Sequence, residues 1–407
     1  MLKPNLVKEH NLGNTAEWES VVTSAALIEH VLIYVAKTLC GSGKIYVCDA
    51  PQTDSSFDKI AQLLDLAQLA QRTSLAYNVS VEIVDLRNEE WQSKEETIIA
   101  RKRLKGDPNG SVAFNLGRDS LFYGHPGEGK YYGADYDSAV VNKHHIGAKQ
   151  EYLVCRTPIK ADVFINLPKL KTHKKTGLTA SLKNLVGINA DKNWLPHHTH
   201  GSPQSNGDEF PSESVLRRLE RFSVSVARHV ALRTPILGTF LARKLRRAGK
   251  VAFGTKGVVR SGNWYGNNTT WRMVLDLNRC LLYGTEAGEL DHSQRKRYYS
   301  IVDGVIAMEG DGPMHGTPKM LGLYISGEDP VAVDIVCSKV MGFDWKKIPM
   351  LREAIKPNRY RITGCVPQEI QVESTSPEFR GRLEDIRFPR SMYFRPHFGW
   401  KGHIEHE

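Results

Sequence analysis

The sequence lacks the features that would assign it to several common classes of protein. It has six cysteines in 407 residues, and no two of them form a Cys-x-x-Cys pair. Because thiolate zinc sites and iron–sulfur clusters need clustered sulfurs, we expect no iron–sulfur cluster and interpret the cysteines as reduced, buried thiols. The Gly-x-x-x-x-Gly-Lys-Ser/Thr loop of P-loop nucleotidases is also missing, which disfavours nucleotide hydrolysis of that type.

Long hydrophobic runs are missing as well. No segment approaches the roughly 18–20 consecutive apolar residues that span a bilayer. The first residues, MLKPNLVKEHNLGN, do not contain the apolar core of a secretory signal. Since 41% of residues are hydrophobic and 9% aromatic, the chain has ordinary globular composition. These observations predict a folded, soluble, cytoplasmic protein.

Positive charge is concentrated in one segment. The chain has a formal net charge of +10, and residues 217–260 hold twelve Lys/Arg and a single acid, Glu220. The rest of the sequence is therefore close to neutral, so the net charge does not indicate a nucleic-acid-binding surface over the whole protein. We expect nucleic acid not to be a general partner.

Alternating helical and strand patterns predict an α/β fold with a mixed, largely parallel sheet, flanking helices and a basic helical insertion. Helical periodicity occupies residues 21–40 and 55–72, and apolar strands follow each of them at 44–50 and 79–87. Further strands are predicted at 152–168, 299–308 and 320–327, and helices at 178–187, 269–283 and 330–341. We place residues 1–211 and 261–407 in one α/β domain and assign residues 212–260 to the insertion.

The densest chemical signal is NLPKLKTHKKTGLTASLKNLVGIN, residues 166–189. A strand ends at Pro168 and a polar loop with several lysines is predicted to follow, before a helix begins near Thr176. Ammonium groups, hydroxyls and free backbone N–H groups at a strand end favour an anion site, because ligands of parallel sheets bind there. The alternative is a solvated basic loop. The candidate residues are Lys169, Lys171, His173, Lys183 and Asn184.

Two other segments carry carboxylates or imidazoles. In residues 188–211, His197, His198, His200 and Asp208 are candidate ligands of a divalent metal, although a surface or substrate-contacting loop is the alternative. In residues 302–334, Glu309 lies in a glycine-rich turn and Asp329 precedes Pro330 at a helix start. Asp329 is either an N-cap or, with Glu309, a base, a metal ligand or a lysine partner.

An aromatic and amide-rich loop precedes the helix predicted at 269–283. Trp264 and Trp271 flank Asn267, Asn268 and Thr269, so the loop suits a carbohydrate or base platform. Capping of the helix by Asn268 or Thr269 is the alternative.

Several motifs together resemble the domain of unknown function 362 family. They are Lys3-Pro4-Asn5, Asp49-Ala50-Pro51, NLPKLKTH…TGLTASLKNLVG, Asp303-Gly304-Val305…Glu309-Gly310-x-Gly312-Pro313 and Gly327-Glu328-Asp329-Pro330-Val331-Ala332-Val333-Asp334. The resemblance implies an intracellular α/β protein of bacterial or archaeal type. Some relatives carry ferredoxin-like cysteine motifs, which this sequence lacks. In the family, Lys-Pro-Asn usually ends a strand, so either that strand is truncated here or it is lost.

The leading hypothesis is an enzyme that binds an anionic small molecule, such as a carboxylate, phosphate or sugar phosphate, with possible help from a divalent metal. His173, Lys171, Asp329 and Glu309 are the candidate catalytic residues. Asn5, Asp49, Lys169, Lys183, Asn184, Trp264 and Trp271 are the candidate substrate-binding residues. The alternative is a non-catalytic protein that acts through residues 217–260 on an anionic membrane surface or on nucleic acid.

Overall fold

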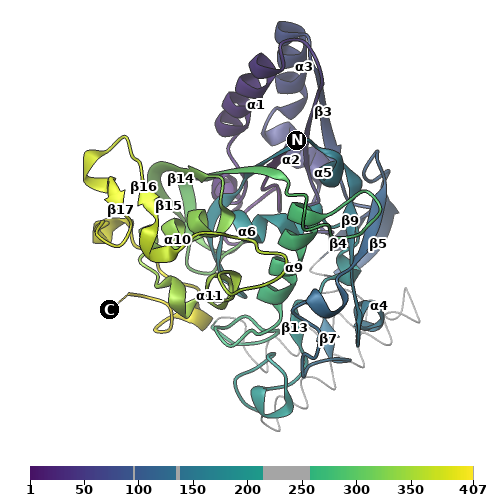
Figure 1. Ribbon diagram of the computed structural model, residues 1–407, viewed down its shortest axis with the longest axis vertical. Helices are drawn as coiled ribbons and strands as arrows, with labels where there is room; N and C mark the ends of the chain where they lie inside the picture. Colours follow the sequence, from purple (N-terminus) through teal and green to yellow (C-terminus); the bar gives the residue numbers. More distant parts are fainter. Residues whose placement is uncertain (95–96, 134–137, 214–256, 407) are drawn as a thin grey trace.

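The computed structural model describes residues 1–94, 97–133, 138–213 and 257–406 (Figure 1). The predicted basic insertion, residues 212–260, falls almost entirely on 214–256 and thus lies outside the described residues. Everything below concerns the described part of the chain.

A largely parallel sheet forms the centre of the molecule. Short β1 pairs in parallel with β10 on one side and β2 on the other, and β14 extends the sheet beyond β10. The antiparallel strand β15 pairs with β14. The α/β prediction with a mixed, largely parallel sheet is therefore confirmed, and the strand that carries Lys3 is present. In spatial order the strands are β15 (Thr317–Gly327), β14 (Arg297–Glu309), β10 (Val163–Leu167), β1 (Leu2–Pro4), β2 (Lys44–Asp49) and β3 (Ser80–Asp85).

The segment after β10 differs from the prediction. Residues 169–173 form a strand, β11 (Lys169–His173), which continues β10 past Pro168 and pairs with the second half of β14. All five residues of β11 are buried, so the predicted polar loop is wrong. The chain then turns back through β12 (Gly177–Thr179), which pairs with β11 in antiparallel fashion, before the short helices α6 (Ser181–Asn184) and η3 (Leu185–Ile188). The helix predicted at 178–187 is therefore shorter and divided.

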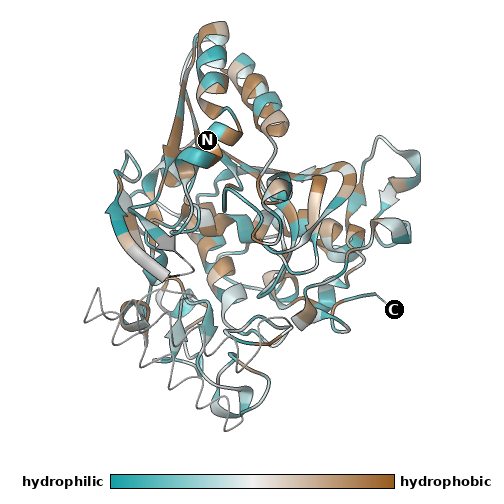
Figure 2. Ribbon diagram, turned by 180° about the vertical axis from the view of Figure 1, so that it is seen from behind, coloured by the Kyte–Doolittle hydropathy of each residue, from teal (hydrophilic) through white to brown (hydrophobic). Residues whose placement is uncertain are grey.

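One face of the sheet is covered by α1 (Ala25–Leu39), α2 (Phe57–Leu63) and α3 (Leu66–Tyr77), which lie together beside β3 in Figure 1. Their apolar residues, including Ile28, Leu32 and Ile60, share a core with Leu2, Val47 and Leu167 of the strands. Figure 2 shows hydrophobic and hydrophilic residues alternating along these helices. The single helix predicted at 55–72 is two helices, because Asp65 adopts a left-handed conformation (φ 51°) between them.

The opposite face is covered by α6, α9 (Thr270–Tyr283) and α10 (Pro330–Val340), with α11 (Pro349–Ala354) packed beyond them. Helix α9 is buried on nearly all sides, and its Leu277, Cys280 and Leu281 belong to the larger of the apolar cores. Since α6 is enclosed between the sheet, α9 and α10, its side chains are held against the carboxyl ends of the strands.

Smaller antiparallel units surround this framework. The remaining strands and helices are β4 (Glu89–Lys94) with β5 (Thr97–Arg103), β6 (Ser111–Asn115) with β9 (Lys149–Cys155) and β8 (His145–Ile146), β7 (Tyr131–Tyr132) with β13 (His198–Thr199), β16 (Gln371–Val372) with β17 (Gly381–Arg382), α4 (Ser138–His144) and α5 (Arg156–Lys160).

One stretch of the described chain, Thr15–Leu39, has the length and composition of a membrane-crossing helix, although the sequence predicted none. Half of its most apolar window is buried inside the protein. The stretch is also divided into a 3-10 helix, η1 (Thr15–Ser20), and α1. Its apolar residues are accounted for by the contact between α1 and the sheet.

Candidate functional site

Three lysines are buried where the central parallel strands end. Lys3 of β1 and Lys169 and Lys171 of β11 are each exposed by 1% or less. A buried ammonium group is costly unless it is paired or hydrogen-bonded. Each of the three therefore has specific partners, and these partners determine how the site is built.

Lys3 pairs with Asp49 at the end of the neighbouring strand β2. The Lys3 Nζ to Asp49 Oδ1 distance is 2.7 Å, and the other carboxylate oxygen accepts a hydrogen bond of 2.7 Å from the Leu6 backbone N–H. The chain at Gly187 passes so close that a Cβ there would lie 1.9 Å from Asp49 Oδ1. Asp49 is thus a lysine partner inside the fold.

Lys169 pairs with Asp303 of β14, which lies directly opposite it in the sheet register. The Nζ to Oδ2 distance is 3.0 Å, and the Ser24 backbone N–H donates to the same oxygen at 2.8 Å. Burial lowers the pKa of Lys169 despite the attraction of Asp303. The carboxylate therefore also fixes the start of α1.

Among the residues that the structure describes, the Lys171 ammonium has two hydrogen-bond partners, and both are neutral. Its Nζ donates to Asn5 Oδ1 at 2.7 Å and to the Val21 carbonyl at 2.8 Å. Burial, and then the charges of Lys169 and Lys183, hold its pKa well below the usual lysine value. Because its donors point into the protein, Lys171 organises the site and does not present its ammonium to a ligand.

Asn184 of α6 joins these groups. Its Oδ1 accepts from Lys3 Nζ at 3.2 Å and from Asn5 Nδ2 at 2.8 Å, and its Nδ2 donates to Asn166 Oδ1 at 2.7 Å. The helix is anchored by Asp334, whose carboxylate accepts from two backbone N–H groups at the start of α6. The structure thus brings the predicted residues Asn5, Asp49, Lys171 and Asn184 close together.

Lys183, the residue before Asn184, is the exception among these lysines. It is partly exposed, and its ammonium has no hydrogen-bond or ion-pair partner among the residues that the structure describes. Burial and the positive charges of Lys192, Lys3 and Lys174 lower its pKa to about 7. None of these neighbours is acidic, so the local charge balance favours an added anion.

Two histidines accompany Lys183. The Nδ1 of His173 accepts a 3.1 Å hydrogen bond from the Lys175 backbone N–H, so its proton resides on Nε2. Burial, and then the charge of Lys183, hold the pKa of His173 well below its usual value. Burial, and then the charge of Lys175, do the same for His197. Both rings are therefore neutral hydrogen-bonding groups in a positively charged setting.

The two predicted catalytic carboxylates do not join this cluster. Glu309 binds Arg395, with 2.8 Å between Arg395 Nε and Glu309 Oε1. Asp329 caps α10, since its Oδ1 accepts from Val331 N at 2.9 Å and from Ala332 N at 3.0 Å, and its Oδ2 accepts from Thr363. Asp329 is therefore an N-cap, as one of the two interpretations predicted. The carboxylate that pairs with a buried lysine is that of Asp303, and not that of Glu309 or Asp329.

The four predicted metal ligands have separate partners. His198 and His200 both stack on Tyr132, and His200 Nδ1 lies 3.0 Å from Glu209 Oε2. His197 Nδ1 bonds to the Leu195 carbonyl, and Asp208 accepts from Thr199 N, Asn268 N and Thr269 Oγ1. Within the described ranges no three His, Cys, Asp or Glu side chains are grouped to hold a metal ion. The loop is instead fixed by its own hydrogen bonds.

The tryptophans of the predicted platform are buried. Trp264 and Trp271 are each 5% exposed, and Trp264 Nε1 donates to the Asp208 carbonyl at 2.8 Å. The start of α9 is capped by Asn267, whose Oδ1 accepts from Thr269 N and Thr270 N, and not by Asn268 or Thr269. Neither ring is an open stacking surface for a sugar or base.

The sequence interpretation missed Lys192 altogether and gave no site role to Lys3 or Asp303. Lys192 Nζ donates to the Val186 carbonyl at 2.8 Å, and burial lowers its pKa to about 8. A detectable signal existed for the other two, because Lys3 and Asp303 each interrupt an apolar strand segment. Lys192 follows a polar loop and has no such signal.

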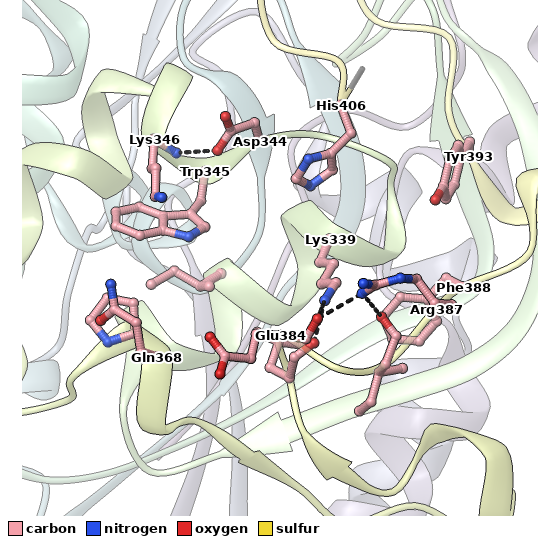
Figure 3. A pocket seen from close by; sticks show the side chains of 14 residues that line it. Lys339, Asp344, Trp345, Lys346, Gln368, Glu384, Arg387, Phe388, Tyr393 and His406 are labelled. Carbon is pink, nitrogen blue, oxygen red and sulfur yellow. Dashed lines mark hydrogen bonds between the residues drawn. The ribbon is translucent and has the colours of Figure 1, made fainter.

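A hollow of about 520 Å³ lies away from this cluster, between α10 and the C-terminal segment (Figure 3). Two of its cations are bound to the chain around them: Lys339 Nζ donates to the Leu383 and Glu384 carbonyls, and Arg387 donates to the Glu384 carbonyl. These contacts attach the C-terminal segment to α10 and make the hollow a weaker candidate than the Lys183 cluster.

Comparisons with known proteins give one family. A family model described as Domain of unknown function (DUF362) matches residues 90–339. The thylakoid-associated protein sll1697 of Synechocystis sp. is 35% identical over 81 residues, which are 18% of this chain and 25% of that protein. A crystal structure of a Thermotoga maritima protein aligns with 13% identity and a TM-score of 0.29, over 79% of this chain and 59% of that one. This chain spans less than two thirds of the length of either relative.

The close approach at Gly187 gives a first prediction. In Gly187→Ala the new Cβ would collide with Asp49 Oδ1 and lie 2.7 Å from Lys3 Nζ, which separates the buried ion pair. We expect the free energy of unfolding to fall by about 2–4 kcal/mol, measured by urea denaturation. Gly364→Ala is the control, because a Cβ there meets no atom within 4 Å. Equal midpoints for the two variants would contradict the assignment.

The cap at Asp329 gives a second prediction. Asp329→Ala removes the acceptor of two backbone N–H groups of α10 and should lower the free energy of unfolding by about 1 kcal/mol, while Asp329→Asn should retain most of it. Thermal unfolding of both variants measures this. A catalytic carboxylate would give the opposite pattern, with unchanged stability in both variants and activity lost in the amide.

Proposed function

This chain belongs to the domain of unknown function 362 family, and on that premise we propose that it binds a small anionic molecule at a site centred on Lys183. We call the site, made of Lys183, His173, His197 and Lys192, the Lys183 site. The observation that supports the proposal is the unpaired ammonium of Lys183. The neighbouring groups that shift its pKa are all cationic. A carboxylate or phosphate oxygen would relieve this repulsion and accept charge-assisted hydrogen bonds.

Two buried side chains of the same segment support the proposal. The Thr179 hydroxyl and both polar atoms of the Asn189 amide have no hydrogen-bond partner among the described residues. Buried polar groups are rarely left unsatisfied, because each costs about 1–3 kcal/mol. Residues 179–189 therefore include both these unsatisfied hydrogen-bonding groups and the unpaired ammonium of Lys183.

The chemistry at this site also suits an enzyme. A lysine with a pKa of about 7 can give and take a proton at neutral pH. Neutral His173 offers Nε2–H as a donor to a substrate oxygen, since Nδ1 already accepts the Lys175 N–H. We propose that the bound anion is a substrate, that Lys183 moves its proton and that His173 orients it. Lys171 and Asn184 position Lys183 through the network behind it.

The pKa of Lys183 gives a third prediction, with sulfate as the probe because its charge is constant between pH 6 and 9. Below pH 7 Lys183 is charged, so sulfate affinity should be highest there and should fall as pH rises through 7. Lys183→Met should weaken binding at pH 6 by about 10- to 100-fold. Isothermal titration calorimetry measures both effects.

Two further variants make this test specific. Burial also lowers the pKa of Lys175 to about 7 and that of Lys192 to about 8, so a change of affinity with pH alone does not identify Lys183. Lys183→Arg keeps the charge at all these pH values, and it should retain binding while losing most of the decrease near pH 7. Lys401→Met, on the exposed surface, should match the unchanged protein. Unaltered sulfate affinity in Lys183→Met would refute the proposal.

The basic segment supports a second candidate function, contact with an anionic membrane surface. Residues 217–260 combine twelve Lys/Arg with Val, Leu, Ile and Phe, a composition typical of segments that bind membrane surfaces. The Synechocystis relative is named as thylakoid-associated, a description that applies to that protein. We propose that electrostatic attraction to lipid headgroups would add to the small-molecule function and would not replace it.

A fourth prediction tests this contact. The full-length protein should bind vesicles with 30% phosphatidylserine and should not bind vesicles of pure phosphatidylcholine. Binding should weaken as the salt concentration rises. Changing Arg243, Lys244, Arg246 and Arg247 to Gln should weaken binding at least tenfold in a sedimentation assay, at about 1 kcal/mol per charge. Sulfate binding should be unchanged in this variant. Equal binding to both kinds of vesicle would exclude the electrostatic mechanism.

A further inference from the structure

A hollow of about 660 Å³ shares no residue with the Lys183 site. Its walls come from residues 121–126, from the loop at 199–208, from residues 265–272 at the start of α9, and from residues 349–356 of α11 and the turn after it. The volume falls in the range of small-molecule sites. The hollow is also lined by most of the aromatic and amide-rich loop that precedes α9, and this loop takes no part in the Lys183 site. We call it the His125 pocket.

His125 is a donor that lacks an acceptor. The side chain lines the pocket and is 6% exposed. Its Nδ1 accepts the Gly127 backbone N–H at 3.1 Å and lies 3.1 Å from the Tyr131 hydroxyl, so the proton resides on Nε2. That Nε2 is buried and has no hydrogen-bond partner among the described residues. An acceptor on a ligand would satisfy it.

The charges on the walls favour an acidic ligand. Arg272, Arg352 and Lys356 line the pocket, and Glu353 pairs with both Arg352, at 3.2 Å, and Lys356, at 2.6 Å. The other carboxylate, Asp208, already accepts three hydrogen bonds from its own loop and α9. The cations thus outnumber the carboxylates, and neither carboxylate is available to bind a ligand cation.

The remaining walls favour a hydroxylated ring. The Tyr265 ring is 42% exposed, with one side stacked on His403 at 3.5 Å between centroids. Asn206 and Asn268 are exposed amides beside it. Arg272 covers the Trp271 ring at 4.4 Å and bonds to the Leu121 carbonyl, so it forms a rigid wall. An apolar ring face flanked by amides and cations matches a sugar with an acidic substituent.

We propose that the His125 pocket is a second ligand site, which binds a sugar bearing a phosphate or carboxylate group. His125 Nε2–H donates to a ring substituent, Asn206 and Asn268 bond to hydroxyls, and Arg352 and Lys356 hold the acidic group. The proposal is independent of the Lys183 site and does not require that site to be functional.

Binding is tested by saturation-transfer NMR and calorimetry on the full-length protein with four probes: glucose 6-phosphate, glucuronate, glucose and sulfate. We expect glucose 6-phosphate or glucuronate to bind at least about tenfold more tightly than glucose. Which of the two binds more tightly identifies the acidic group. Failure of both to bind at about 10 mM, or equal binding of glucose, would overturn the proposal.

Variants locate the binding. His125→Phe keeps an aromatic ring and removes the N–H, and it should weaken binding of the acidic sugar by about tenfold. Arg352→Glu with Lys356→Glu, on exposed side chains, gives a second readout if His125→Phe does not fold, and it should abolish binding. In a Lys183→Met background the Arg352/Lys356 variant should still abolish the remaining acidic-sugar binding, so failure of one site does not imply failure of the other. Unchanged affinity in the Arg352/Lys356 variant contradicts the assignment.

Discussion

The structure depends on satisfying three ammonium groups buried at the carboxyl ends of its central strands. Lys3, Lys169 and Lys171 are nearly inaccessible to solvent, and each has different partners. Lys3 pairs with Asp49 and Lys169 with Asp303, whereas Lys171 donates to two neutral groups, Asn5 and the Val21 carbonyl. Because these partners come from residues 5, 21, 49 and 303, the lysines join segments that are distant in the sequence. The same contacts fix the start of α1, the end of β2 and the middle of β14.

This arrangement explains why the remaining charge appears at Lys183. The carboxylates of Asp49 and Asp303 are already bound to buried lysines, and Asp334 accepts two backbone N–H groups of α6. None of these three carboxylates is left to pair with Lys183, although α6 holds it among other lysines. A protein that only needed a stable fold would gain by replacing this side chain with a neutral one. We therefore propose that a ligand pairs with this cation.

The sequence predicted the architecture well because strand and helix periodicity depend on local pattern. It predicted β2, β3, α9 and α10 within a few residues. It failed at residues 169–173, where the polar side chains suggested a loop. Lysines can lie inside a strand there because they bind Asn5 and Asp303, which are distant in the sequence. The same cause explains Glu309 and Asp329: their types suit catalysis, but only the fold shows Arg395 beside one and the N–H groups of α10 beside the other. Residue type thus indicated residues 166–189 as a candidate site, whereas the pairing within that segment required the structure.

A single carbonyl lies between the two proposed ligand sites. The oxygen of His197 accepts from Lys175 Nζ at 3.2 Å, from Asn267 Nδ2 at 3.1 Å and from Thr270 Oγ1 at 2.6 Å. Lys175 lies beside His173 of the Lys183 site, and Asn267 lines the His125 pocket. Asp208, also in that pocket, raises the pKa of Lys175, which burial lowers to about 7. The charge of Lys175 therefore contributes to the electrostatic potential on both sides of this carbonyl. The hydrogen bonds to the carbonyl form a rigid wall that keeps the two proposed sites physically separate, although both lie in the field of the same ammonium group.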